Sequence, residues 1–146
     1  MRNPLRTESS INLGLLLARL PMGAFFLLAG VHKVSAGVQN FVSSQLGNVP
    51  SQIPRNWAEG YLHALPYTEI VVGSLLILGL FGRLAGFAGA FVVTTIIIGA
   101  TGIYANGLPF HPNLIYLGLL LMILLVGPGR IGLDGMLFGR RRVGNS

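Results

Sequence analysis

Cysteine is absent from this chain of 146 residues, and charged residues are scarce. The absence of cysteine excludes disulfides, thiolate catalysis and cysteine metal sites. Only 10% of the residues are charged, against about a quarter in soluble domains. A soluble domain of this size has too much surface to cover with so few charges. The composition therefore indicates a membrane protein.

The motifs of the common soluble enzymes are also missing. No Gly-rich phosphate loop follows a strand, and neither an HExxH sequence nor a nucleophile elbow occurs. Four acidic residues oppose ten basic ones, which gives a net charge of +6. Basic ends are usual in membrane proteins. We therefore attribute the excess charge to contact with the lipid bilayer and predict no nucleic acid partner.

Long apolar runs make up most of the chain. A run of about 20 apolar residues is long enough to cross a bilayer, and these runs lack the alternation that a barrel strand needs. We predict an all-α integral membrane four-helix bundle that forms one domain over residues 1–146. The predicted spans are 11–34, 64–81, 84–104 and 108–127, with an outer loop over 35–63 and a basic tail over 128–146.

The positions of the cations predict the orientation. Four spans place both termini on one side, and seven of the ten Lys and Arg residues fall on that side. Two cations fall on the other side, and Arg19 lies within the first span. The positive-inside rule then makes both termini cytoplasmic in a multi-pass inner membrane protein. The seven are Arg2, Arg6, Arg83, Arg130, Arg140, Arg141 and Arg142, and the two are Lys33 and Arg55.

The outer loop carries its own local signals. "VQNFVSSQL" (38–46) predicts a short helix in the membrane interface, and two prolines break the stretch after it. "WAEGYLHAL" (57–65) predicts an interfacial segment with Trp57 and Tyr61 at headgroup level. Pro66 then starts or kinks the second span.

Charged residues lie inside two of the apolar runs. At 100° per residue, Arg19 shares one face of the first span with Gly23, Phe26, Gly30 and Lys33. Intramembrane charges face the bundle interior, and glycines let another helix approach closely. The face is therefore predicted to be a packing surface that carries a buried charge.

The second span repeats this arrangement. Glu69, Gly73 and Arg83 fall on one face, in the same order of charge, glycine and cation. Gly82, just before the third span, and Gly86 within it are small residues four apart, which is typical of close helix packing.

Arg19 needs a partner at its expected depth. Glu69 is the only acid within a predicted span, so we expect Arg19 to pair with it, directly or through one water. At about 1.5 Å per residue, counting from a cytoplasmic boundary at Ser10 puts Arg19 about 13 Å deep, and counting from Arg83 at the same boundary puts Glu69 about 21 Å deep. Glu69 can instead meet Lys33, or a histidine from the outer side. Such a group either fixes helix register or forms a polar site for a proton, a quinone headgroup or a substrate.

Three histidines are predicted on the outer side: His32, His63 and His111. Imidazole binds metal or haem and shuttles protons. No HxH or HxxxH pair occurs, so we treat the three as outer-face polar groups and predict no metal site.

Three motifs, taken in order, are similar to those of the DoxX family of small membrane proteins. "RLPMGAFFLLAGVHKV", "TEIVVGSLLILGLFGR" and "NLIYLGLLLMILLVGPGRIGLD" carry the resemblance, which covers about residues 12–135. The specific positions are Arg19, Gly23, Gly30, Lys33, Glu69, Gly73, Gly79, Arg83, Gly127, Pro128, Gly129, Arg130, Leu133 and Asp134.

The resemblance implies a four-helix membrane bundle and two kinds of function. Some relatives are subunits of a thiosulfate:quinone oxidoreductase, while others are linked to redox defence or to assembly of membrane proteins. We therefore expect a membrane subunit of a quinone-linked redox complex, with other membrane or periplasmic subunits as partners and quinone as the candidate cofactor. The alternative is a non-catalytic subunit or assembly factor that docks partners through its helix faces and outer loop.

Overall fold

The computed structural model describes residues 4–98, 113–127, 129 and 131–134. These residues form helices and turns and contain no strand, which confirms the predicted all-α class. The helices are α1 (Pro4–Ser35), α2 (Val38–Leu46), α3 (Arg55–Leu78), α4 (Gly82–Ile96) and α5 (Asn113–Val126).

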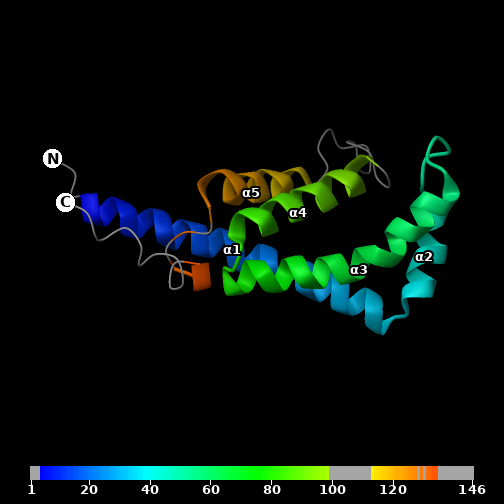
Figure 1. The fold of residues 1–146 in the computed structure, drawn as a ribbon, viewed down its shortest axis with the longest axis horizontal. Coiled ribbons are helices and arrows are strands. Elements are labelled where there is room, and N and C mark those ends of the chain that lie inside the picture. Colours follow the sequence, from blue (N-terminus) through cyan, green and yellow to red (C-terminus); the bar gives the residue numbers. More distant parts are fainter. Residues whose placement is uncertain (1–3, 99–112, 128, 130, 135–146) are drawn as a thin grey trace.

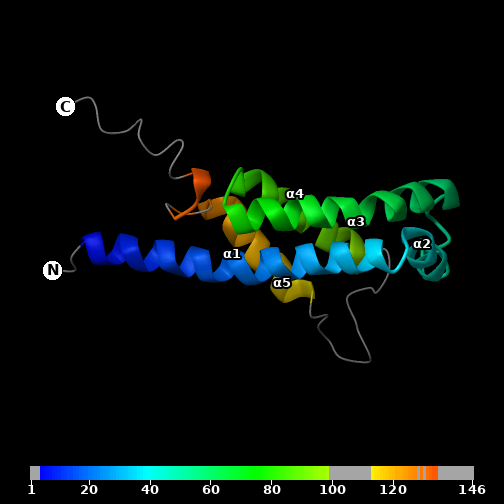
Figure 2. The ribbon, with the colours of Figure 1, turned by 90° about the horizontal axis from the view of Figure 1, so that it is seen from below.

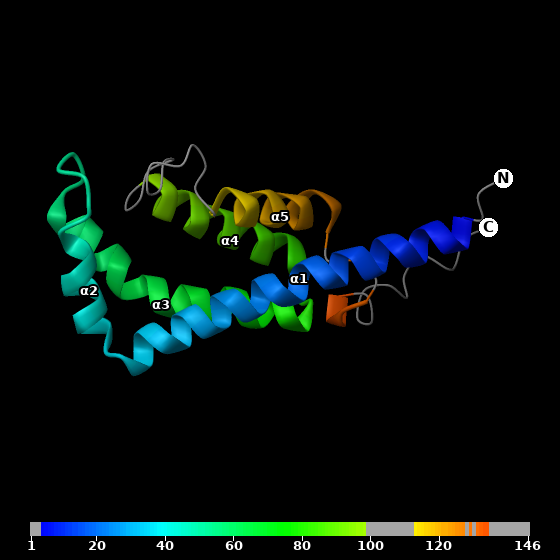
Figure 3. The ribbon, with the colours of Figure 1, turned by 180° about the vertical axis from the view of Figure 1, so that it is seen from behind.

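The long helices form two layers. α1 and α3 run antiparallel and lie side by side (Figure 2), and their contact is the most extensive among the described helices. α4 and α5 pack on one another as the second layer, visible in Figure 1 and from behind in Figure 3. α2 lies across the end of the bundle where α1 ends and α3 begins (Figure 1).

Within the described residues, two helices are long and apolar enough to cross a membrane, judged by length and composition: Ser9–Ser35 and Arg55–Leu78. α4 and α5 are shorter apolar helices. The remainder of the predicted third and fourth spans, residues 99–104 and 108–112, lies outside the described residues. Large apolar side chains such as Leu28 (67% exposed) and Leu125 (77%) point away from the bundle, as suits a surface in contact with lipid.

The connection between α1 and α3 is shorter than the outer loop predicted over 35–63. α2 forms at the predicted position, and α3 begins at Arg55 instead of residue 64. Pro54 is the N-cap of α3, and its fixed φ and missing N–H are tolerated at a helix start. The helix continues through Pro66, which is buried. The interfacial segment predicted at 57–65 is therefore the first part of a continuous helix.

Glycines set the distance between α1 and α3. A Cβ atom on Gly30 would lie 2.5 Å from the carbonyl oxygen of Pro66, and one on Gly73 would lie 2.5 Å from the amide nitrogen of Leu27. Gly23 faces the backbone of Gly73 in the same way. Backbone atoms cannot move aside as a flexible side chain can, so only glycine permits this approach.

We predict that Gly30→Ala and Gly73→Ala each destabilise the protein by about 1–3 kcal/mol, because an added methyl group overpacks a backbone contact. Thermal unfolding in detergent measures the effect. Gly118→Ala is the matched control, since a Cβ atom there meets nothing within 4 Å. Equal stability of all three variants would contradict the backbone contact.

Candidate functional site

A partly buried ion pair joins the C-terminal end of α1 to the middle of α3. Lys33 Nζ lies 2.5 Å from Glu69 Oε1 and 2.6 Å from Oε2, so the ammonium group bonds both carboxylate oxygens. The Glu69 side chain is 4% exposed and that of Lys33 is 21% exposed. Charges at such a site need a partner, because burying an unpaired carboxylate costs several kcal/mol.

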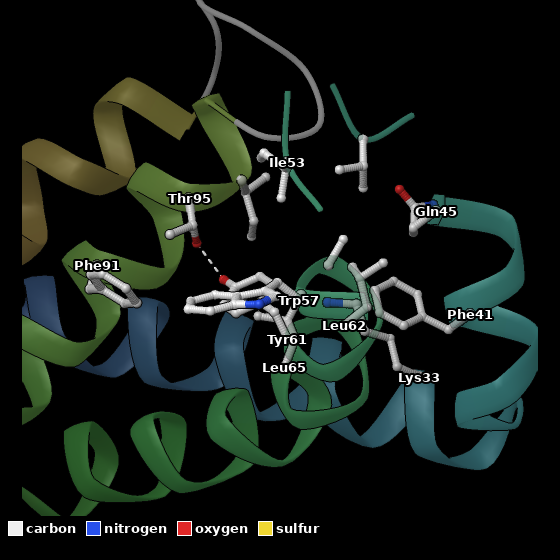
Figure 4. Close-up of a pocket in the computed structure, with 13 residues that line it drawn as sticks. Lys33, Phe41, Gln45, Ile53, Trp57, Tyr61, Leu62, Leu65, Phe91 and Thr95 are labelled. Carbon is white, nitrogen blue, oxygen red and sulfur yellow. Dashed lines mark hydrogen bonds between the residues drawn. The ribbon is translucent and has the colours of Figure 1, made fainter. Parts of the chain in front are cut away.

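Lys33 also faces a cavity of about 450 Å³ between α2, α3 and α4. We call this cavity the Lys33 pocket. The Phe41 ring lies with its centroid 5.1 Å from Lys33 Nζ, a cation–π distance. Trp57 forms part of the pocket wall and is 74% exposed. Figure 4 shows the lining residues, which are Lys33, Phe41, Gln45, Val49, Ile53, Trp57, Ala58, Tyr61, Leu62, Leu65, Phe91, Thr95 and Ile96.

A hydrogen bond between α3 and α4 crosses the pocket wall. The Tyr61 hydroxyl is bonded to Thr95 Oγ1 (Figure 4). Thr95 Oγ1 donates to the Val92 carbonyl oxygen (2.7 Å). Because a hydroxyl has one proton, Tyr61 is the donor in its bond to Thr95. The Tyr61 oxygen keeps its capacity as an acceptor towards the pocket.

Arg19 lies at the other end of the bundle. Its Nη2 donates to the Ile131 carbonyl oxygen (2.8 Å), and the residue is 2% exposed. Its guanidinium packs on Gly79, which ends α3 with φ 65°; a Cβ atom there would lie 2.6 Å from Nη1. A side chain at residue 79 would therefore displace Arg19.

Asp134 completes the contact at this end. Its Oδ1 accepts from the Phe81 N–H (2.9 Å) and its Oδ2 from the Gly82 N–H (3.0 Å). The carboxylate thereby caps the start of α4, where unsatisfied N–H groups and the helix dipole favour an anion. Its own N–H donates to the Gly79 carbonyl oxygen (3.0 Å), and its charge attracts Arg19. Segment 131–134 is thus bound to the α3–α4 turn.

The expected pair between Arg19 and Glu69 is therefore wrong. Within the described residues, Glu69 bonds Lys33 and Arg19 bonds the backbone at Ile131. The depth count placed the start of the first span at Ser10, but α1 runs past the end of α3 (Figure 1). Arg19 consequently lies level with Gly79, about 15 Å from Glu69 along α3 at 1.5 Å per residue.

The remaining predicted residues occupy several places. His32 is exposed and His63 is half-buried, and neither lines the Lys33 pocket. His111 lies outside the described residues, as do Pro128 and Arg130. The described part of the chain holds no group of three His, Cys, Asp or Glu residues that could bind a metal ion.

The glycines of α4 also lie at contacts. Gly82 donates to Asp134, and a Cβ atom on Gly86 would lie 3.0 Å from the backbone nitrogen of Leu124 in α5.

Sequence reasoning missed three contributors to these sites: Phe41, Thr95 and Asp134. Phe41 and Thr95 come from helices far apart in the sequence, and no periodic pattern links them to Lys33. Asp134 belonged to the family motif, but the motif did not indicate its contact with the start of α4. Alignment of Gly23 with Gly73 in two antiparallel helices is a signal that would have separated Arg19 from Glu69.

We predict energetic coupling between Lys33 and Glu69 but not between Arg19 and Glu69. Glu69→Gln should destabilise by about 2 kcal/mol, because Lys33 loses its partner while staying partly exposed. Adding Lys33→Met should recover much of that loss. Arg19→Gln and Glu69→Gln should add to within about 0.5 kcal/mol, since distant sites act independently. Double-mutant cycles on thermal unfolding in detergent test both statements, and the reverse pattern would contradict this site.

Comparison with known proteins gives a family for the chain. The model of the DoxX family matches residues 14–102, a stretch that contains the Lys33–Glu69 pair and the residues of the Lys33 pocket. Of the contact between Arg19 and segment 131–134, only Arg19 lies within the matched residues. No curated protein and no solved structure gives a significant match. Since the match covers more than half of the chain, this protein belongs to the DoxX family, whose members are generally membrane proteins.

Proposed function

We propose that this protein is a membrane subunit of a quinone-linked redox complex and that a quinone headgroup binds in the Lys33 pocket. The observation that carries the proposal is an apolar cavity of about 450 Å³ whose wall contains Lys33, the cation of the ion pair with Glu69. Sites for small organic ligands are typically apolar cavities of about 300–1,000 Å³ with a few convergent polar groups. The pocket fits this description.

The side chains of the pocket suit a flat ring with carbonyl oxygens. Two of the three N–H donors of Lys33 go to Glu69, so the third can donate to a carbonyl oxygen. Glu69 balances the charge of Lys33 and can hold a proton. Phe41 and Trp57 offer aromatic faces for stacking. A bound quinone would supply a redox couple that takes up two electrons and two protons on reduction to the quinol.

The electrons must come from a partner. The chain has no cysteine and therefore no thiol couple of its own. α2 and the segment up to α3 stand at the end of the bundle (Figure 1), and residues from both line the pocket. A partner subunit docked there, from the membrane or the periplasm, would approach the Lys33 pocket directly.

The cation asymmetry supports a multi-pass protein of the inner membrane with both termini in the cytoplasm. The pocket then lies towards the outer side. We predict that a reporter at the C-terminus is cytoplasmic and that one inserted within 40–50 is not. Protease access to the C-terminal tail from outside intact spheroplasts would contradict this orientation.

We predict that a short-chain quinone quenches the fluorescence of Trp57, the single tryptophan of the chain. Lys33→Met/Glu69→Leu should raise the dissociation constant at least about tenfold, because a hydrogen bond from a charged donor contributes about 1.5–3 kcal/mol. Removing both charges avoids leaving one buried and unpaired.

The matched control is Arg55→Met/Glu59→Leu. It removes one cation and one acid from the exposed start of α3, outside the pocket lining, and should leave quenching unchanged. The proposal fails if no quinone quenches Trp57, or if the purified complex reduces no quinone analogue with any sulfur donor.

The second candidate function is a non-catalytic subunit or assembly factor. The exposure of Trp57 beside α2 favours it, since a large aromatic side chain at a surface is a common anchor for a partner protein. Co-purification separates the two functions. A stable complex that needs Trp57 and keeps its activity in Lys33→Met/Glu69→Leu would support the second.

A further inference from the structure

A second hollow lies between α3 and α4, next to the Lys33 pocket. Its volume is about 420 Å³, and we call it the α3–α4 groove. Three residues line both spaces: Tyr61, Leu65 and Phe91. The two hollows therefore adjoin one another along a shared wall.

The two spaces differ in chemistry. The Lys33 pocket has the ammonium group and the hydroxyls of Tyr61 and Thr95. Beyond Tyr61 the groove is walled mainly by apolar side chains. The one additional hydroxyl, that of Thr68, is already bonded to the Ala64 carbonyl oxygen (3.1 Å). Polarity thus falls from the pocket into the groove.

The groove opens towards the surroundings of the bundle. Its α4 side is lined by Leu84, Phe87 and Phe91, which are 60%, 58% and 56% exposed. From Phe91 to Leu84 the groove follows α4 for two turns, about 10 Å at 1.5 Å per residue. On a membrane protein this exposed apolar face meets the acyl chains of the bilayer.

We propose that the α3–α4 groove holds the hydrocarbon tail of the quinone whose headgroup lies in the Lys33 pocket. The inference rests on the proposed function and adds the substrate class, a long-chain quinone that enters sideways from the bilayer. Three observations select this occupant: the shared lining, the fall in polarity and the exposed apolar mouth. A polar head and an apolar tail match the two spaces in the same order.

The test blocks the groove without touching the pocket. Ala64 is exposed, lines the groove and does not line the pocket, so Ala64→Phe fills the groove alone. The probes are one quinone ring carrying either a methyl or a decyl chain, and the readout is quenching of Trp57. Gly118→Phe is the control, because it adds the same ring to α5 where a Cβ atom meets nothing within 4 Å.

We expect Ala64→Phe to raise the dissociation constant of the decyl probe about tenfold and that of the methyl probe less than twofold. Gly118→Phe should change neither. Partitioning of the probe into detergent affects the apparent dissociation constants of the variant and the unaltered protein equally, so their ratio in the same detergent is free of this effect. An unchanged melting temperature shows that Ala64→Phe still folds.

Two outcomes overturn the inference while leaving the proposed function intact. One is equal binding of the decyl probe to Ala64→Phe and the unaltered protein. The other is full displacement of the decyl probe by decanol at matched concentration, which would make the groove an ordinary lipid contact. If neither probe quenches Trp57 in the unaltered protein, the proposed function itself fails.

A second measurement does not depend on variants. A quinone with a diazirine at the end of its decyl chain should label the groove side of α3 and α4, within residues 64–68 and 84–92, when irradiated and analysed by peptide mass spectrometry. Labels confined to α1 or α5 would contradict a tail in the groove.

Discussion

The close backbone contact between α1 and α3 is the constraint on which the rest of the structure depends. Gly23 and Gly30 on one helix and Gly73 on the other remove the side chains that would hold the two backbones apart. The contact admits one antiparallel register, because a shift of either helix brings a larger side chain against a backbone. That register places Lys33 beside Glu69 and Arg19 beside Gly79.

The same register separates two charges that look alike in the sequence. Arg19 donates to a peptide carbonyl and packs on glycine, so its role at that end is to hold segment 131–134. Lys33 is partly exposed, has a carboxylate partner and faces a cavity. The rise between them on α1 is about 21 Å. A charge that organises the backbone and a charge that faces a pocket therefore occupy opposite ends of one helix face.

Sequence patterns predicted the helical class, the glycine face of α1 and the family, because each depends on local spacing. The face that carries Arg19, Gly23, Gly30 and Lys33 follows from the helical period alone. Pairing across helices depends on register, and a count from assumed membrane boundaries misjudged it because α1 extends beyond α3. The pocket is lined by residues from four helices, so no stretch of sequence indicated that Phe41 and Thr95 would share a cavity with Lys33.

The neutrality of the Lys33–Glu69 pair has a consequence for what the pocket can accept. A lone ammonium in an apolar wall would attract anions, but Glu69 cancels that charge at a separation of 2.5 Å. A small sulfur anion entering the pocket would lose its hydration and gain no net charge opposite it, which is unfavourable in an apolar site. A neutral ring with carbonyl oxygens loses little hydration, and one of those oxygens can still accept a hydrogen bond from the third N–H of Lys33. In the proposed function, an anionic electron donor must therefore react on the partner subunit, while the neutral acceptor occupies this pocket.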